Sequence, residues 1–498
     1  MNRGKAAIFR CILVACAAAL PLSGNSAAAA PRDRALEAKL RAHIDILASD
    51  DFQGREPGTE GEAKTLRYLG KEWFDIGLVS GTNDPGNEWF APVTLVAREP
   101  ASSGAQFARK GRRQYLQKNA VLVLTSGSRS LVREAPVVFV GRGQAPLPDR
   151  NELAGRVALL LDAEIRDSER QNALLAAGAS AVMTVLDGDR TLENVAARRQ
   201  RSGYALANDE VGGDLEAFIT REGMESLLRG SGRTVGSLEK AAERADFKPQ
   251  VLDLTASLEA TTRETTIRTY NLIGKLPGKR RDAGAVLLVA HWDAFGLCAE
   301  PPAEDQICNG AIDNASGLAA LTEIARRLTR GAPMDRDVYF LATTSEELGL
   351  LGAHAFAENP PIPLSRFVAA FNIDSIAIAP AGTPLTIVGK GVTKLDAQIA
   401  AVAKRERRKI VGDESANAYM KRQDGWALLQ HDVPTVMVTS AYADLKKIEA
   451  FFDSDYHRPT DNPTPQIELG GAAEDVQFHV ALTRWFADSR RVPSPPAK

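Results

Sequence analysis

The sequence predicts an α/β fold in which a central sheet carries helices on both faces, together with a β-rich segment of different texture. From Tyr270 onward, short apolar runs typical of buried strands alternate with segments whose apolar residues recur at helical spacing. Between about 118 and 250, short strand patterns bounded by turn residues dominate instead. A length of 498 residues exceeds one ordinary domain, so two or three domains are expected.

The elements follow in chain order. Helices are expected within 34–82, on either side of a Gly/Pro turn cluster, and residues 90–112 look extended. The expected strands of the alternating region are 270–276, 284–290, 337–343, 367–373, 384–388 and 434–439, and its expected helices lie near 314–330, 348–358, 392–407, 424–431 and 469–490. In such sheets ligands gather at the carboxyl ends of strands, so the residues after each strand are the candidate site.

Composition and charge exclude some classes of function. An apolar fraction of 44% and a charged fraction of 25% are typical of soluble globular proteins. The net charge is −2, and it becomes −5 without residues 1–30, which hold Arg3, Lys5 and Arg10 but no acid. This balance does not favour a nucleic-acid partner.

Residues 1–30 have the pattern of a secretory signal peptide. Basic residues precede an apolar stretch at 11–22, and small residues precede Pro31. The apolar stretch is too short to span a membrane. A lipoprotein signal ending at Cys16 is the alternative interpretation. Export to a periplasm or beyond is therefore predicted, which leaves Cys298 and Cys308 in the mature chain. In an oxidising compartment these two are expected to form a disulfide, with two buried thiols as the alternative.

Side chains that bind metal ions follow several of the predicted strands. The candidates are His291 and Asp293 after 284–290, Asp313 at the next helix, Glu346 and Glu347 after 337–343, Asp374 after 367–373, and His457 with Asp455 and Asp461 nearby. Singly, each has an ordinary structural explanation, such as a helix cap. Jointly, they fit two divalent ions that share one carboxylate. Nitrogen and oxygen ligands without thiolate favour zinc, with manganese or cobalt as substitutes.

Five segments in this order, HWD, NGAIDNASG, TTSEELGLLGA, FNIDS and SDYHRPTD, resemble the co-catalytic zinc exopeptidases of metallopeptidase family 28. That family includes bacterial aminopeptidases, glutamate carboxypeptidase II and the transferrin receptor. The resemblance implies the zinc exopeptidase fold, with a mixed central sheet flanked by helices. It also implies that residues 31–115 and 256–492 form the peptidase domain, that 116–255 is an inserted protease-associated domain, and that 493–498 is a tail.

The resemblance also implies a role for each candidate residue. His291 and Asp374 would hold one zinc ion, Glu347 and His457 would hold the other, and Asp313 would bridge the two. The remaining candidates act beside the ions: Glu346 as the general base that takes a proton from a metal-activated water, Asp293 behind His291, Asp455 behind His457, and Tyr419 as a possible stabiliser of the intermediate or simply a buried aromatic.

The expected protein is thus an exported di-zinc exopeptidase, an aminopeptidase that removes N-terminal residues from peptides, with no nucleic-acid partner and no membrane span. A carboxypeptidase acting on acidic dipeptides is the first alternative, for which Lys421 and Arg422 would supply cations. A single-zinc glutaminyl cyclase is another alternative. A catalytically inactive binding protein of the transferrin-receptor kind would have lost ligands that this chain keeps.

Overall fold

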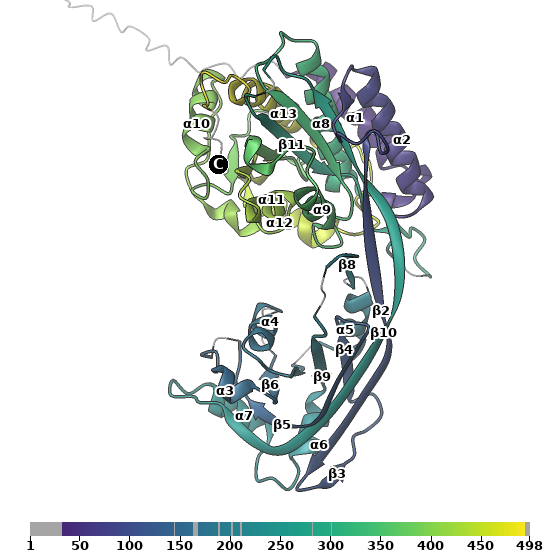
Figure 1. The fold of residues 1–498 in the computed structure, drawn as a ribbon, viewed down its shortest axis with the longest axis vertical. Coiled ribbons are helices and arrows are strands. Elements are labelled where there is room, and N and C mark those ends of the chain that lie inside the picture. The colour runs from purple at the N-terminus through teal and green to yellow at the C-terminus, as the bar shows by residue number, and fades with distance from the viewer. Residues whose placement is uncertain are drawn as a thin grey trace, which may run out of the picture. The chain divides into compact units, whose positions relative to one another are not determined.

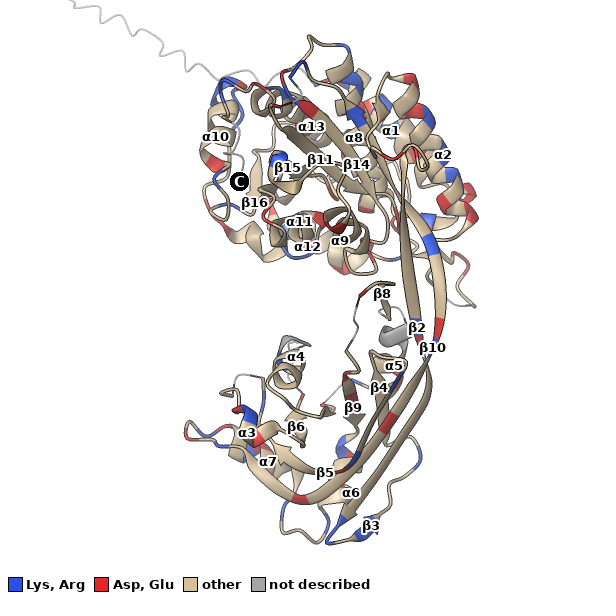
Figure 2. Cartoon of the chain, in the orientation of Figure 1, with Lys and Arg blue, Asp and Glu red and all other residues tan. Residues whose placement is uncertain are grey.

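The computed structural model describes residues 32–143, 145–162, 168–187, 190–200, 203–209, 212–280, 282–299 and 301–493. The predicted signal peptide at 1–30 and the tail beyond 493 lie outside these ranges. Within them, no helix combines the length and the apolar character that crossing a bilayer requires. Acidic and basic residues are intermingled along the N-terminal helices (Figure 2), as the small net charge leads one to expect.

The central sheet is mixed, as predicted (Figure 1). Its parallel core runs in the order β17, β15, β11, β14, and antiparallel strands flank that core at both ends. The strands are β17 (Thr435–Thr439), β15 (Phe367–Asn372), β11 (Ala285–His291) and β14 (Asp337–Thr343), with β16 (Thr386–Val388) and β10 (Gln250–Leu276) outside them. Because parallel strands end on the same edge, their following residues share one rim.

Helices cover both faces of this sheet. Alternate side chains of β11 enter different clusters, because successive side chains of a strand point to opposite faces. Val286, Leu288 and Ala290 belong to one buried cluster, and Leu287 and Val289 to another. The helices of the first cluster are α1 (Arg34–Leu47), α2 (Glu60–Asp75), α8 (Ser316–Thr329), α10 (Asp396–Arg405) and α13 (Leu469–Phe486), and those of the second are α9 (Leu351–Glu358) and α11 (Asp424–Gln430).

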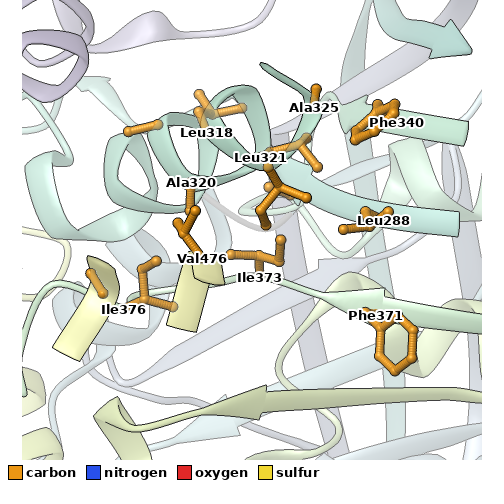
Figure 3. Close-up of a cluster of buried hydrophobic side chains, with 14 of the residues drawn as sticks. Leu288, Leu318, Ala320, Leu321, Ala325, Phe340, Phe371, Ile373, Ile376 and Val476 are labelled. Carbon is orange, nitrogen blue, oxygen red and sulfur yellow. The ribbon is translucent and has the colours of Figure 1, made fainter. Parts of the chain in front are cut away.

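The larger cluster holds α8, the helix that follows the candidate residue Asp313, against the sheet. Leu318 and Leu321 of α8 belong to the same buried cluster as Leu288 and Phe340 of the sheet, and Leu321 points towards the sheet (Figure 3). Removing a side chain of this size from water contributes about 1.5–3 kcal/mol. This packing fixes α8 against β11 and β14, and so it fixes the start of α8 relative to the strand ends.

Most predicted elements of the alternating region are confirmed. Helix α12 (Leu445–Ser454) was not predicted, although its buried residues, Ile448 and Phe451, recur at helical spacing. The strand expected at 270–276 is the end of the much longer β10, which pairs with β2 (Phe90–Arg109) over most of its length. Sequence patterning finds only the fully buried end of such a strand, since its middle is polar and half exposed.

The prediction of a β-rich segment near 118–250 was wrong in one respect, because helices there are as extensive as strands. The strands are β3 (Arg112–Gln114), β4 (Val121–Thr125), β5 (Arg129–Phe139), β6 (Val157–Leu161), β7 (Ala181–Val185), β8 (Tyr204–Leu206) and β9 (Leu215–Ile219). The helices are α3 (Arg150–Leu153), α4 (Ser168–Ala176), α5 (Leu192–Gln200), α6 (Arg221–Leu228) and α7 (Val235–Ala242). Strands β5, β6, β7 and β9 are parallel neighbours in that order. Their apolar runs stand out in the sequence more clearly than these short helices.

Candidate metal centre

Three parallel strands bring candidate ligands to one rim. His291 is the last residue of β11, and Asp374 lies two residues beyond β15. The Nε2 atom of His291 lies 3.6 Å from Oδ1 of Asp374 and 3.2 Å from Oδ1 of Asp313. These three side chains form one group whose ligand atoms are close enough to share an ion.

Asp313 lies in the irregular turn Ala311–Ala315 that precedes α8. Its two carboxylate oxygens face different histidines. Oδ1 faces His291, and Oδ2 lies 3.5 Å from Nε2 of His457. The peptide bond between Asp313 and Asn314 is cis. One carboxylate therefore stands between two imidazoles, which is the geometry of a bridging ligand.

Glu347 completes a second group with Asp313 and His457. Its Oε2 atom lies 2.8 Å from Nε2 of His457. Ser345 before the two glutamates, Ser375 after Asp374, and His457 itself all have positive φ angles between 50° and 58°. Non-glycine residues adopt this left-handed conformation at a cost, and such strain is concentrated at functional sites.

The donor set fits divalent cations. Nε2 of His291 and Nε2 of His457 are both buried without a hydrogen-bond partner, although buried polar atoms are nearly always paired. His291, Asp313 and Asp374 are between 2% and 6% exposed. Carboxylates buried this closely repel one another unless a cation lies among them. Two imidazoles and several carboxylates, with no thiolate, suit zinc or a similar ion.

The pKa values of these groups show the same electrostatic imbalance. Burial lowers the pKa of His291, but Glu346, Asp313 and Asp374 outweigh it and raise that pKa well above its usual value. Burial likewise opposes the charged form of His457, yet its carboxylate neighbours raise its pKa to about 9. Burial raises the pKa of Glu346 well above its usual range. These directions show that the carboxylates of the site favour a positive charge among them.

Part of this chain is similar to known peptidases. The sequence model of peptidase family M28 matches residues 271–477. Aminopeptidase YwaD of Bacillus subtilis is 29% identical over 181 residues, which are 35% of this chain and 37% of that protein. A probable glutamate carboxypeptidase of Arabidopsis thaliana, LAMP1, is 33% identical over 123 residues, which are 24% of this chain and 16% of that protein.

The match to peptidase family M28 thus covers residues 271–477, which are less than half of this chain. The aligned stretches are 37% of the Bacillus protein and 16% of the Arabidopsis protein, so each relative is matched over only part of its length. The fold extends further than the sequence match, because an aminopeptidase structure from Aneurinibacillus sp. strain AM-1 superimposes with a TM-score of 0.56 at 17% identity, covering 93% of this chain and 96% of that one.

Asp293 lies next to the strand that ends in His291, but its carboxylate does not chiefly contact that histidine, as had been expected. It accepts hydrogen bonds from the backbone N–H groups of Glu346 and Glu347, at 3.1 and 3.3 Å. Nδ1 of His291 is closer to the carbonyl oxygen of Asp293, at 3.1 Å, than to its carboxylate, at 3.7 Å. Asp293 therefore holds the glutamate turn against the histidine strand.

His457 is flanked by aromatic rings. The ring of Tyr456 stacks on it at 3.5 Å and that of Phe295 lies at 4.4 Å. The carboxylate of Asp455, expected behind His457, accepts a hydrogen bond from Ser454 Oγ at 3.2 Å. The expected role for Asp455 is therefore not matched by this contact, and ring packing orients His457.

Asn314 links two turns of the candidate site, a role that the sequence analysis did not predict. Its side chain donates to the carbonyl of Ile373 and accepts from the backbone N–H groups of Gly317 and Ser375. It thereby joins the Asp313 turn to the Asp374 turn. A Cβ atom at Gly317 would lie 2.2 Å from Asn314 Oδ1, so only glycine fits there. The segment NASG was the available signal, but a motif does not show which turn its side chains reach.

A small pocket lies beside Glu346 and Asp374. Its other lining residues include Tyr419, Arg422, Tyr442, Phe452 and Tyr456. The guanidinium of Arg422 lies over the rings of Phe452 and Tyr456, at 4.6 and 5.3 Å from their centroids. Aromatic rings and one cation therefore line this side of the site.

The predicted disulfide between Cys298 and Cys308 is confirmed. It closes the hairpin of β12 (Gly296–Leu297) and β13 (Ile307–Cys308). This hairpin lies in the chain between His291 and Asp313, and Phe295 at its base packs on His457. The bridge therefore shortens the free loop between two candidate ligands.

Proposed function

We propose that this protein is a di-zinc exopeptidase and that it acts as an aminopeptidase. One observation carries the proposal: the Asp313 carboxylate lies between Nε2 of His291 and Nε2 of His457, two buried nitrogens that face carboxylate oxygens without forming a hydrogen bond. One carboxylate that faces two such imidazoles is explained by two ions that share it. The M28 family match and the similarity to the Bacillus aminopeptidase support the choice of peptidase chemistry.

The ligand assignment follows the two groups of side chains. His291 and Asp374 would hold one zinc ion, Glu347 and His457 the other, and Asp313 both. Each group would offer its ion one histidine nitrogen and carboxylate oxygens from two residues, a donor set suited to zinc. Zinc binding requires both histidines to lose their protons, so the carboxylates would exchange a proton partner for an ion.

The proposed reaction is hydrolysis of a peptide bond. The bound ions supply Lewis acidity, which lowers the pKa of an attacking water and polarises the scissile carbonyl. The Glu346 carboxylate takes the proton of that water and then passes it to the nitrogen of the leaving amine. Asp293 fixes the backbone of Glu346 and so aims this carboxylate.

The phenol of Tyr456 is better situated than that of Tyr419 to donate to a developing oxyanion. Tyr456 is partly buried and lines the same pocket as Asp313 and Glu346. Burial raises its pKa most, and the charges of Asp313 and Glu347 raise it further. Tyr419 instead donates to Glu449 at 3.4 Å. We therefore assign the stabilising role to Tyr456, with Arg422 beside it.

A carboxypeptidase acting on acidic peptides is the second candidate. Arg422 favours it, because this cation lines the same pocket as Glu346 and could pair with a free carboxylate. Peptides with free and blocked N-termini distinguish the two activities. Aminopeptidase activity requires the free amine, whereas cleavage of N-blocked acidic dipeptides would show the second candidate to be right.

Export to a periplasm or beyond also belongs to this proposal, and so does a protease-associated domain at 116–255. The Cys298–Cys308 bridge supports an oxidising compartment. Elemental analysis of the purified full chain tests the central claim. Two zinc ions per chain, together with release of N-terminal residues, are expected, and a folded protein that binds no divalent ion would overturn it.

A further inference from the structure

A buried arginine outside the M28 match makes four hydrogen bonds to backbone carbonyls. Arg55 is 0% exposed. Its Nε donates to Trp292 O at 2.8 Å, its Nη1 to Leu47 O at 2.8 Å and Asn309 O at 2.6 Å, and its Nη2 to Gly310 O at 3.0 Å. A planar guanidinium can bond several fixed acceptors at once, which an ammonium group cannot do with the same geometry.

Three of the four acceptors belong to the segments that carry candidate ligands, and the fourth, Leu47, ends α1. Trp292 lies directly between His291 and Asp293. Asn309 and Gly310 begin the turn that leads to Asp313 three residues later. Arg55 thus spans the two ends of the loop between the histidine and the bridging carboxylate.

The same turn is held from its other side by Asp461, which is 3% exposed. Its carboxylate accepts from the N–H groups of Ile312 and Asp313, at 2.9 and 3.1 Å, and its carbonyl accepts from Ala311. The carbonyls at the start of the turn therefore point to a buried cation, and the amides at its end to a buried carboxylate. Neither residue reaches the ligand atoms itself.

Arg55 also brings charge to the site. Burial lowers its pKa to about 10, while Asp461, Asp293 and Asp313 act in the opposite direction. It therefore remains a cation at neutral pH. Hydrogen bonds from a charged donor are stronger than neutral ones, particularly where water is excluded.

We propose that Arg55 is a positioning residue for the metal centre: it sets the distance between His291 and the bridging Asp313 by holding both ends of the loop that joins them. The proposal rests on the di-zinc function proposed above. The N-terminal segment thereby becomes part of the site, although it lies outside residues 271–477. A misplaced bridge should weaken zinc binding even in a folded protein, because affinity depends on ligands held in advance at the required distances.

The test compares Arg55→Lys and Arg55→Met with Arg336→Lys in the full-length protein. Arg336 is the matched control, since it is also 0% exposed and donates to the carbonyls of Ala283, Phe486 and Val492. It precedes β14, at the end of that strand opposite the glutamate turn. Circular dichroism and thermal melting of the metal-free proteins establish that each variant folds. Zinc dissociation constants come from competition with a chelator, and cobalt-substituted protein reports ligand geometry through its visible absorption.

Both Arg55 variants are expected to bind the weaker zinc ion about 10- to 100-fold less tightly, the range for losing an outer contact to a metal ligand. Their cobalt spectra should differ from that of the wild type. Arg336→Lys should lower the melting temperature but keep wild-type zinc affinity and the wild-type cobalt spectrum. Asp461→Asn provides a second test if an Arg55 variant does not fold, since an amide nitrogen facing the Ile312 and Asp313 amides should displace the same turn.

Each outcome decides something. Wild-type zinc affinity in folded Arg55→Met would overturn the positioning role. Wild-type affinity in Arg55→Lys would overturn the requirement for the guanidinium fork, and an equal loss in Arg336→Lys would show general destabilisation instead. If neither Arg55 variant folds, wild-type affinity in Asp461→Asn overturns the proposal. A wild-type protein that binds no zinc would overturn the proposed function, whatever the variants do.

Discussion

Parallel strands end at a common edge in two regions of this protein, but the charged side chains at the two edges are arranged differently. At the edge of β11, β14 and β15, carboxylates converge with two histidine nitrogens that have no hydrogen-bond partner. At the edge of β5, β6, β7 and β9, opposite charges face each other. The ion pairs there are Arg190–Asp162 at 2.8 Å, Arg142–Asp187 at 3.7 Å and Arg221–Glu239 at 2.6 Å.

The difference shows that strand topology brings side chains together at one edge, and that the charges of those side chains decide whether the edge can bind a metal ion. The ends of parallel strands lie on one rim in both regions. Where the rim residues include both signs, they neutralise one another. Where they share one sign, the imbalance needs an external cation, and the proposed zinc centre meets that need.

The largest effect is expected for Glu346→Gln. This change keeps the shape of the side chain but removes the carboxylate that accepts a proton. Turnover should fall by about 10²- to 10⁴-fold. Zinc content should stay at the wild-type level, since Glu346 is not among the assigned ligands. Steady-state kinetics on zinc-loaded protein measures the loss, and Glu358→Gln, at the exposed end of α9, serves as the control. Turnover near the wild-type rate would refute the assignment.

His457→Ala should reduce bound zinc from about two ions per chain to about one, because it removes the nitrogen that faces both Glu347 and Asp313. Activity should fall with the lost ion. Elemental analysis after dialysis against a weak chelator measures the stoichiometry. Arg190→Met, at the paired edge, should leave two ions bound. Unchanged zinc content in His457→Ala would contradict the ligand assignment.

Glu323 of α8 differs from the carboxylates of the candidate metal centre, because this buried carboxylate is paired with arginine side chains. Burial raises its pKa, but hydrogen bonds with His43, Arg326 and Arg327 outweigh burial and lower it to about 2. A depressed folded-state pKa stabilises the fold above the unfolded value of about 4.5, and that contribution is lost as the pH falls towards 2.

Glu323→Gln should therefore lower the free energy of unfolding by about 2–3 kcal/mol at pH 7 and by much less near pH 2. Urea unfolding at both pH values checks this, with zinc removed so that metal binding does not contribute. An equal loss at both pH values would mean that packing, rather than charge, holds Glu323 in place.

The smallest effect is expected for Arg221→Met at the paired edge. The guanidinium donates two hydrogen bonds to Glu239, but its side chain is 42% exposed. A solvent-exposed ion pair of this kind contributes about 0–1 kcal/mol. Thermal melting should shift by a few degrees at most, and less at high salt. A change in zinc content would contradict the conclusion that this edge takes no part in metal binding.

The fold of the alternating region was largely predictable from the sequence, and the reason is local. Residues 284–290 are an almost continuous apolar run, and 337–343 contain a shorter one at 338–342. Such runs are typical of strands that are buried on both faces of a sheet. The half-exposed length of β10 carries a weaker pattern and was missed. Helix α12 was missed as well, although its apolar residues recur at helical spacing. The segment at 118–250 was described as β-rich because its strands are apolar and its helices short.

The candidate ligands were predictable for a related reason, since each follows a strand whose direction and edge the alternation implies. Their partners were not. Asn314, Arg55 and Asp461 act through backbone groups of segments distant in the chain, and no local pattern records such contacts. The same applies to Asp293, whose expected contact with His291 proved to be chiefly one with the glutamate turn.

The sequence by itself determined the strand and helix pattern, the inventory of imidazoles and carboxylates, and the pair of cysteines that bridge. These depend on residue types and short-range spacing. The tertiary structure alone decided that the two oxygens of Asp313 face different histidines, that Arg55 reaches the loop between them, and that the charges of the other edge are already paired. Such relations depend on distances between segments that only the packing of helices on the sheet defines.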